Sequence, residues 1–161
     1  MRRSLEIAII AIFSALSAVS TTYTAVPSPT GGYTHIGDSM IFIAALLFGV
    51  RVGGLVGIIG PTVADLVVGY PRWYVSIVAH GLEGLIAGLG RKKGIPWQTA
   101  LCLIGGIGMS LTYFSINIFI KGIGPALISL FRDIGGQTVV STIIAVPITK
   151  AIEAVLKEYL E

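Results

Sequence analysis

The sequence predicts an all-α integral membrane protein, a bundle of six transmembrane helices with both ends of the chain in the cytoplasm. Hydrophobic residues make up 54% of the 161 positions, charged residues only 12%, and the mean hydropathy is +0.89. A typical soluble domain carries about 25% charged residues. The polar residues are therefore too few to coat a water-soluble globule, and the composition fits a lipid bilayer.

The first two apolar runs differ in length, and a spanning helix needs about 17 to 25 residues. The first run predicts a helix over 4–24, closed by two prolines and two glycines in residues 27–32. Because no cleavage-like end follows it, we expect a retained helix rather than a signal peptide. The second run predicts a helix over 36–50, whose strictly apolar part, from Ser39, is short for a full crossing.

The rest of the chain predicts four further helices, over 53–69, 73–90, 97–120 and 125–156. The last contains Pro147, which removes a backbone donor and should kink or weaken the helix. Residues 26–35 remain as an outer loop between the first two helices. A chain of this length predicts a single transmembrane domain over 1–161, without a separate soluble module.

Lysines and arginines predict the orientation, because cytoplasmic loops carry an excess of them. With the N-terminus inside, eight lie at cytoplasmic helix ends and three at outer ends. The inner set is Arg2, Arg3, Arg51, Arg91, Lys92, Lys93, Lys150 and Lys157, and the outer set is Arg72, Lys121 and Arg132. An odd number of helices would place Lys150 and Lys157 outside and remove this asymmetry.

Several classes of protein are disfavoured. The net charge of +3 and the pI near 9.2 do not indicate nucleic-acid binding, because the basic residues lie at helix ends rather than on one face. The single cysteine, Cys102, excludes a disulfide within the chain, and its apolar surroundings are typical of packing. Metal-ligand spacing and phosphate-binding glycine loops do not occur. We therefore expect no metal, no cofactor and no nucleic-acid partner.

Polar side chains inside the membrane are candidates for function, since each ionisable group costs about 2.5 to 3.5 kcal/mol on insertion. The topology places most of them in the outer half of several helices, while the inner halves are almost purely apolar. This asymmetry predicts a pocket open to the outside rather than a continuous pore. The residues concerned are Asp38, Asp65, His80, Glu83, Tyr113, Asn117, Arg132, Asp133 and Gln137.

Structural explanations exist for many of these residues. Asp38 and Asp65 would serve equally as helix caps or as partners of Arg72. Asp133 would serve as the partner of Arg132 or Lys121, and His80 as a hydrogen-bonding group between helices. The aromatic residues Tyr70, Trp73 and Tyr74 suit a membrane interface, and stacking on a flat heterocycle is the alternative.

Glu83 is the hardest to explain structurally. It lies in the middle of its helix, with no lysine or arginine within one turn. A lone carboxylate there needs a donor, which is either His80, one turn away on the same face, or a nitrogen of a ligand.

Small residues recur at spacings that favour helix contact. Gly53 and Gly57, and likewise Gly84 and Gly88, stand four positions apart, which allows close approach of helix backbones in lipid. In the first helix the alanines form a stripe along one face, made of Ala8, Ala11, Ala15 and Ala18. This stripe would pack internally or face another membrane protein.

The stretch from residue 32 to 90 resembles a known family. Residues 32–49 read GYTHIGDSMIFIAALLFG, and they are followed by GGLVG (53–57), ADL (64–66), GYP (69–71) and GLEGLIAG (81–88). These motifs resemble the S components of energy-coupling factor (ECF) vitamin transporters, in the branch of hydroxymethylpyrimidine and pyridoxine-type members. The remainder agrees with that family in helix count and length.

The resemblance implies a non-enzymatic subunit in the cell membrane of a prokaryote. It would capture a vitamin or a vitamin precursor at the outer face and deliver it inward by reorienting in the membrane. The implied partners are a transmembrane coupling subunit and two cytoplasmic ATPase subunits. Ala11 and Ala15 match the alanine-xxx-alanine motif through which family members contact the coupling subunit, and residues 26–35 resemble the family's lid over the pocket.

The family's pocket is formed by the lid and helices four to six, and the expected substrate is a small flat nitrogen heterocycle such as hydroxymethylpyrimidine, thiamine or a pyridoxine-like compound. The expected binding residues are Glu83, His80, Asn117, Tyr113, Asp133, Gln137 and Trp73.

Two other classes of function stay open. A self-sufficient small transporter or channel could use Glu83 and His80 for proton coupling. A membrane-embedded enzyme could use His80, Glu83 and Asp65 for acid–base work, although no nucleophile or metal-ligand pattern accompanies them.

Overall fold

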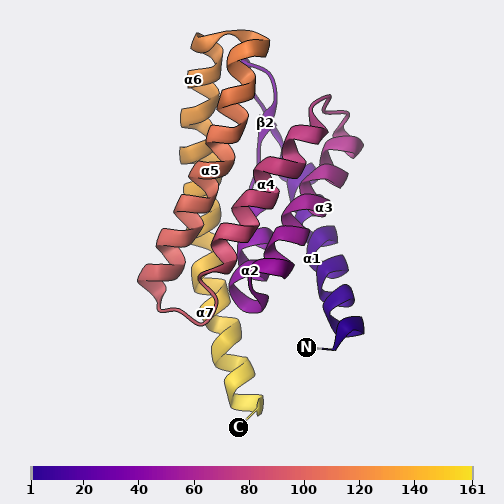
Figure 1. Ribbon diagram of the computed structural model, residues 1–161, viewed down its shortest axis with the longest axis vertical. Helices are drawn as coiled ribbons and strands as arrows, with labels where there is room; N and C mark the ends of the chain where they lie inside the picture. Colours follow the sequence, from indigo (N-terminus) through magenta and orange to yellow (C-terminus); the bar gives the residue numbers. More distant parts are fainter. Residues whose placement is uncertain (1, 161) are drawn as a thin grey trace.

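The computed structural model describes residues 2–160, whose regular structure is helical apart from one short hairpin (Figure 1). The all-α fold predicted from the sequence is therefore confirmed. The first helices are α1 (Arg3–Thr24), α2 (Asp38–Phe48), α3 (Val50–Val68), α4 (Trp73–Gly88) and α5 (Ile95–Lys121). The last helical segment comprises α6 (Ile123–Arg132), the π-helical segment η1 (Asp133–Val139) and α7 (Val140–Leu160). The start of α1 and the end of α7 lie at the same end of the bundle (Figure 1).

Four stretches are long and apolar enough to cross a membrane. They are Arg3–Thr24, Val50–Val68, Ile95–Lys121 and Ile123–Lys157. With 11 and 16 residues, α2 and α4 are shorter than this. By length and composition, four crossings are thus supported, and α2 has the short length that the sequence suggests.

The short helix α2 is the centre of the bundle. It packs against α1, α3, α4 and α7, and Phe42 and Leu46 are fully buried. A helix that is apolar on all sides is buried on all sides. Asp38 stands in the first turn of α2, where the helix dipole favours a negative charge, and this brings a carboxylate into the interior.

The α3–α4 contact depends on glycine. A Cβ atom added at Gly84 would overlap the backbone of Gly53, and one added at Gly57 would overlap the carbonyl of His80. In lipid, such close approach gains dispersion contacts that larger residues would prevent. The packing role expected for these glycines is confirmed, and the contact fixes the position of His80.

The last helical segment differs from the continuous helix expected over 125–156. It begins at Ile123, and residues 133–139 form a π-helix, a wider turn that is common at functional sites. Both Asp133 and Gln137, one turn apart in this segment, are buried. The π-helix thus presents two polar side chains to the bundle interior.

Candidate functional site

The lid loop, residues 26–35, folds as a two-stranded hairpin. Strand β1 (Val26–Pro27) pairs antiparallel with β2 (Tyr33–Thr34). The turn between them uses Gly31 and Gly32, with φ of 80° and 82°, a region that glycine adopts at little cost. The hairpin lies against η1 and contributes residues to a cavity between the helices.

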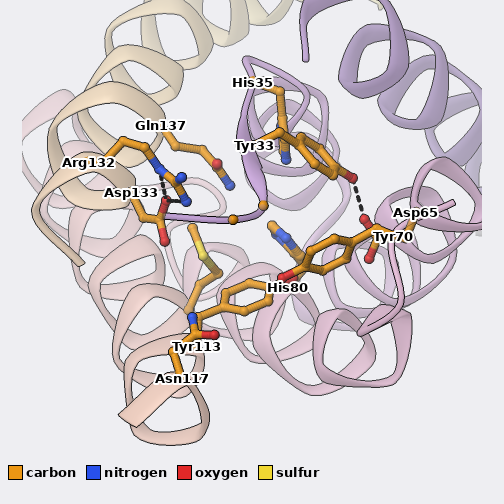
Figure 2. Close-up of a pocket in the computed structure, with 13 residues that line it drawn as sticks. Tyr33, His35, Asp65, Tyr70, His80, Tyr113, Asn117, Arg132, Asp133 and Gln137 are labelled. Carbon is orange, nitrogen blue, oxygen red and sulfur yellow. Dashed lines mark hydrogen bonds and ion pairs between the residues drawn. The ribbon is translucent and has the colours of Figure 1, made fainter. Parts of the chain in front are cut away.

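That cavity is small and polar. Its volume is about 30 Å³, room for two or three water molecules. Figure 2 shows side chains from the lid loop, α3, α4, α5, α6 and η1 converging on it. The lining residues are Gly31, Gly32, Tyr33, His35, Asp65, Tyr70, His80, Met109, Tyr113, Asn117, Arg132, Asp133 and Gln137.

One side of the cavity is a hydrogen-bonded chain centred on Asp65. The Tyr33 hydroxyl donates to one carboxylate oxygen of Asp65, and the Ser76 hydroxyl donates to the other (Figure 2 shows the first bond). Because the Ser76 proton is used in this way, the Tyr113 hydroxyl donates to the Ser76 oxygen. Burial and the neighbouring Asp65 raise the pKa of Tyr33, which keeps it a donor. Lid loop, α3, α4 and α5 are thereby linked.

Beneath the cavity lies the buried triad, which consists of Asp38, His80 and Glu83. His80 Nδ1 is 2.9 Å from Glu83 Oε2 and 3.2 Å from Asp38 Oδ1. Since both neighbours are acceptors, Nδ1 carries the proton. Gln137 Nε2 donates to Asp38 Oδ2 at 2.7 Å, so the triad is tied to the π-helix.

His35 stands beside this triad. The ligand atoms of His35, Asp38 and His80 lie within 4.8 Å of one another, a spacing that would suit a metal ion. However, His35 Nδ1 already accepts a hydrogen bond from the Gly37 backbone N–H at 3.2 Å. Burial lowers the pKa of His35 to about 4, so the ring is neutral near pH 7. His35 Nδ1 is thus already engaged by the backbone, whereas Asp38 Oδ1 has no hydrogen-bond partner among the described residues.

Two basic residues stand at the cavity's other side, and one of them, Lys121, holds the lid loop. Lys121 Nζ donates to the carbonyl of Thr30 at 2.9 Å and to the hydroxyl of Ser129 at 2.8 Å. Arg132 donates from Nε and Nη2 to Asp133 Oδ1, at 2.9 and 2.7 Å. The Arg132–Asp133 pair left open by the sequence is therefore formed.

Two polar atoms of lining residues are buried without a hydrogen-bond partner in the described part of the chain. They are Asn117 Oδ1, an acceptor, and Arg132 Nη1, a donor. Unpaired buried groups are costly, by about 1 to 3 kcal/mol each. A ligand with one donor and one acceptor would satisfy both.

The structure brings five of the seven expected binding residues to the cavity, namely His80, Asn117, Tyr113, Asp133 and Gln137. Glu83 is fully buried under His80 and does not line it. Trp73 is 40% exposed, packs edge-on against Tyr74 and also lies outside the lining. The donor for Glu83 that the sequence required is His80.

The two aspartates do not pair with Arg72. Asp65 binds Tyr33 and Ser76, and Asp38 binds Gln137 and His80, whereas Arg72 Nε donates to the Tyr70 hydroxyl at 2.9 Å. Tyr70, for which stacking on a heterocycle was the alternative to a place at the membrane interface, lines the cavity. Two further lining residues, Tyr33 and His35, were not among the expected binding residues. Both belong to the GYTH run of the lid loop, and the sequence does not indicate whether their side chains point into the cavity or away from it.

The alanine stripe borders an apolar groove between α1 and α3, with a volume of about 470 Å³. Ala11 and Ala15 are exposed and line it together with Ala18, which is only 8% exposed. Ala8 is exposed but lies outside the lining.

Comparison with known proteins places these features in a family. Residues 3–154 match the sequence model of the family described as ECF-type riboflavin transporter, S component. A protein of Pyrococcus woesei, described as an uncharacterized protein in gap 3'region, is 38% identical over 120 residues, 72% of this chain and 80% of that protein. The thiamine precursor transporter HmpT of Lactococcus lactis is 28% identical over 152 residues, 92% of this chain and 87% of the relative. A UPF0397 protein of Lactobacillus helveticus is 35% identical over 125 residues, 76% of this chain and 65% of that protein.

Proposed function

The chain belongs to the family of ECF-type riboflavin transporter S components, and from this premise we propose that it captures a small nitrogen heterocycle at the outer face and delivers it inward by reorienting against a coupling subunit. Membership confirms the resemblance noted in the sequence. It also confirms a transporter subunit in a membrane rather than an enzyme.

The substrate proposed is a vitamin precursor of the hydroxymethylpyrimidine type. A relative of this chain is described as a thiamine precursor transporter. An aminopyrimidine carries an amino donor beside a ring-nitrogen acceptor. The observation that carries the proposal is that two buried polar atoms of lining residues, Asn117 Oδ1 and Arg132 Nη1, lack hydrogen-bond partners in the described part of the chain. Asn117 Oδ1 would accept from such an amino group, and Arg132 Nη1 would donate to such a ring nitrogen.

The lid loop would have to move for this substrate to bind. Ligand pockets generally enclose about 300 to 1,000 Å³, whereas the cavity here has about 30 Å³. The hydrogen bonds from Tyr33 to Asp65 and from Lys121 to Thr30 hold the lid loop over the site. These bonds would break on entry and re-form over the ligand.

Six membrane crossings, with both ends in the cytoplasm, are the topology proposed. Support comes from the termini, which lie at one end of the bundle (Figure 1). The short helix α2 would cross within the bundle, screened from lipid by its neighbours, and α4 would turn the exposed side chains of Val78, Leu82 and Leu85 toward lipid. Eight of the eleven lysines and arginines are assigned to the end with the termini, as the positive-inside rule requires of a cytoplasmic face.

The α1–α3 groove is the face proposed for the transmembrane coupling subunit, which would act with two cytoplasmic ATPase subunits. The groove is almost purely apolar, and the small side chains of Ala11 and Ala15 leave room for a partner helix to approach closely. Such a surface would also let two helices slide while the subunit reorients.

Binding to the purified chain tests the function. Isothermal titration with hydroxymethylpyrimidine, thiamine, pyridoxine and riboflavin should give the tightest binding for hydroxymethylpyrimidine. The variant Asn117→Leu should weaken binding by about tenfold or more, the loss of one hydrogen bond in a buried site.

The matched pair Tyr113→Phe and Tyr74→Phe provides the control, because Tyr113 lines the cavity and Tyr74 is 53% exposed outside it. Only the first change should affect affinity. Tight binding of none of the four compounds, or equal effects of the two tyrosine variants, would contradict the proposal.

A further inference from the structure

A second hollow lies at the end of the bundle that carries the termini. It is formed by the end of α2, the turn between α4 and α5, and α7, which lie side by side there (Figure 1). We call it the basic groove, and its volume is about 550 Å³. It is separate from the substrate cavity, because no described residue lines both.

The basic groove combines a strong positive charge with an apolar floor. Its cations are Arg91, Lys92, Lys93, Lys150 and Lys157. Among the lining residues that the structure describes, Glu153 is the one carboxylate, so five positive charges face one negative charge there. The apolar part consists of Leu46, Leu47, Phe48 and Leu156, of which Leu156 is 45% exposed.

Two of these cations are held in place by backbone carbonyls. Arg91 Nε donates to the carbonyl of Leu47, at the C-terminal end of α2, at 3.1 Å. Lys150 Nζ donates to the carbonyl of Lys93 at 3.2 Å and to Glu153 at 2.6 Å. Glu153 thus offsets Lys150, and the α4–α5 turn adds the charges of Arg91, Lys92 and Lys93.

Setting the topology requires only that lysines and arginines occur in a loop. It requires neither a groove of this size nor an apolar floor beneath the charges. An amphipathic hollow with cations at its rim matches a phospholipid, whose phosphate would meet the α4–α5 turn while an acyl chain covers the leucines. Basic pockets between membrane helices are typical sites for anionic lipid headgroups.

We propose that the basic groove binds an anionic phospholipid, with the headgroup phosphate against Arg91, Lys92 and Lys93 and an acyl chain along Phe48 and Leu156. The occupant is a lipid rather than a free anion, because the half-buried Phe48 and the exposed Leu156 would otherwise face the solvent. This inference is independent of which substrate the outer cavity takes.

Native mass spectrometry of the purified chain in detergent tests it, with phosphatidylglycerol and phosphatidylcholine titrated separately. Wild type should retain phosphatidylglycerol more tightly. The double variant Lys92→Asn/Lys93→Gln should lose about 25-fold in affinity for it, about fivefold for each cation removed. Asn is chosen because Lys92 has a φ of 63°, which asparagine tolerates.

The matched control is Arg2→Gln/Arg3→Gln, which removes the same charge from exposed residues of the N-terminus, outside the groove. It should keep the wild-type preference. Equal retention of the two lipids, or equal losses in the two double variants, would overturn the proposal. Displacement of the lipid by millimolar inorganic phosphate would reassign the groove to a free anion. Unchanged lipid binding with lost association of the coupling subunit would reassign it to protein docking.

Discussion

The hydroxyl of Tyr33 donates a hydrogen bond to the carboxylate of Asp65, across 32 positions of the chain. This bond joins the lid loop to α3. The second oxygen of Asp65 accepts from Ser76, which in turn accepts from Tyr113. One buried carboxylate therefore couples closure of the lid loop to the positions of α4 and α5.

Removing the Tyr33 hydroxyl should speed ligand release. A hydrogen bond to a charged group contributes about 1.5 to 3 kcal/mol. Because water replaces part of this in the open state, we expect Tyr33→Phe to raise the dissociation rate about tenfold with little change in the association rate. Stopped-flow displacement measures both. Tyr23→Phe is the control, since Tyr23 is 85% exposed. An equal effect of Tyr23→Phe on the dissociation rate would contradict the idea that the Tyr33–Asp65 hydrogen bond holds the lid loop closed.

Acid should destabilise the fold through His35. Burial lowers its pKa to about 4, against 6.5 for a free histidine. Between these values the unfolded chain binds the proton and the folded chain does not, so stability falls as pH falls from about 6.5 to 4. At pH 5 the loss is about 2 kcal/mol.

The measurement is the Tm in detergent at pH 7 and pH 5. His35→Asn keeps a side-chain acceptor for the Gly37 N–H but cannot titrate, and should show a smaller drop. The same drop in both proteins would place the acid sensitivity elsewhere.

Gln137 should matter for both stability and binding. Its Nε2 satisfies Asp38 Oδ2, which is fully buried, and the residue also lines the cavity. Gln137→Leu would leave a buried carboxylate oxygen unpaired, at a cost of about 1 to 3 kcal/mol in the free energy of unfolding.

The control is Gln98→Leu, a second fully buried glutamine, whose Nε2 lies 3.5 Å from Glu153 at the other end of the bundle. Thermal unfolding and titration calorimetry should show reduced affinity only for Gln137→Leu. Loss of affinity in both variants would mean that binding merely follows stability.

A large side chain placed in the α1–α3 groove should block transport without affecting substrate binding. Ala11→Trp or Ala15→Trp would fill the groove, and we expect vitamin-precursor uptake by cells to be abolished while the purified variant binds normally. Ile12→Trp is the control, since Ile12 is 59% exposed on the same helix and does not line the groove. Lost binding in either alanine variant would count against an interface.

Composition and apolar runs predicted the helices well, because bilayer thickness and helix rise constrain them strongly. Side chains on regular helices, such as His80 and Tyr113, were predicted at the site from their depth in the predicted topology. The lid loop residues Tyr33 and His35 were not, because their direction depends on a hairpin that only tertiary contacts hold. The π-helix at Asp133 has no simple sequence period, so its extra turn width could not be predicted either.

The close approach of α3 and α4 should be as important for the site as any lining residue. A Cβ at Gly57 would overlap the carbonyl of His80, so Gly57→Ala must push apart the two helices that carry Asp65 and His80. Overpacking of this kind costs about 1 to 3 kcal/mol, and we expect a lower Tm together with at least tenfold weaker binding. Gly124→Ala is the matched control, because outside its own stretch of α6 no atom of the described residues lies within 4 Å of the added Cβ. There alanine should stabilise the helix by up to about 1 kcal/mol and leave binding unchanged. Because the two substitutions add the same methyl group, opposite signs in Tm would locate the constraint in the α3–α4 contact, and equal signs would contradict it.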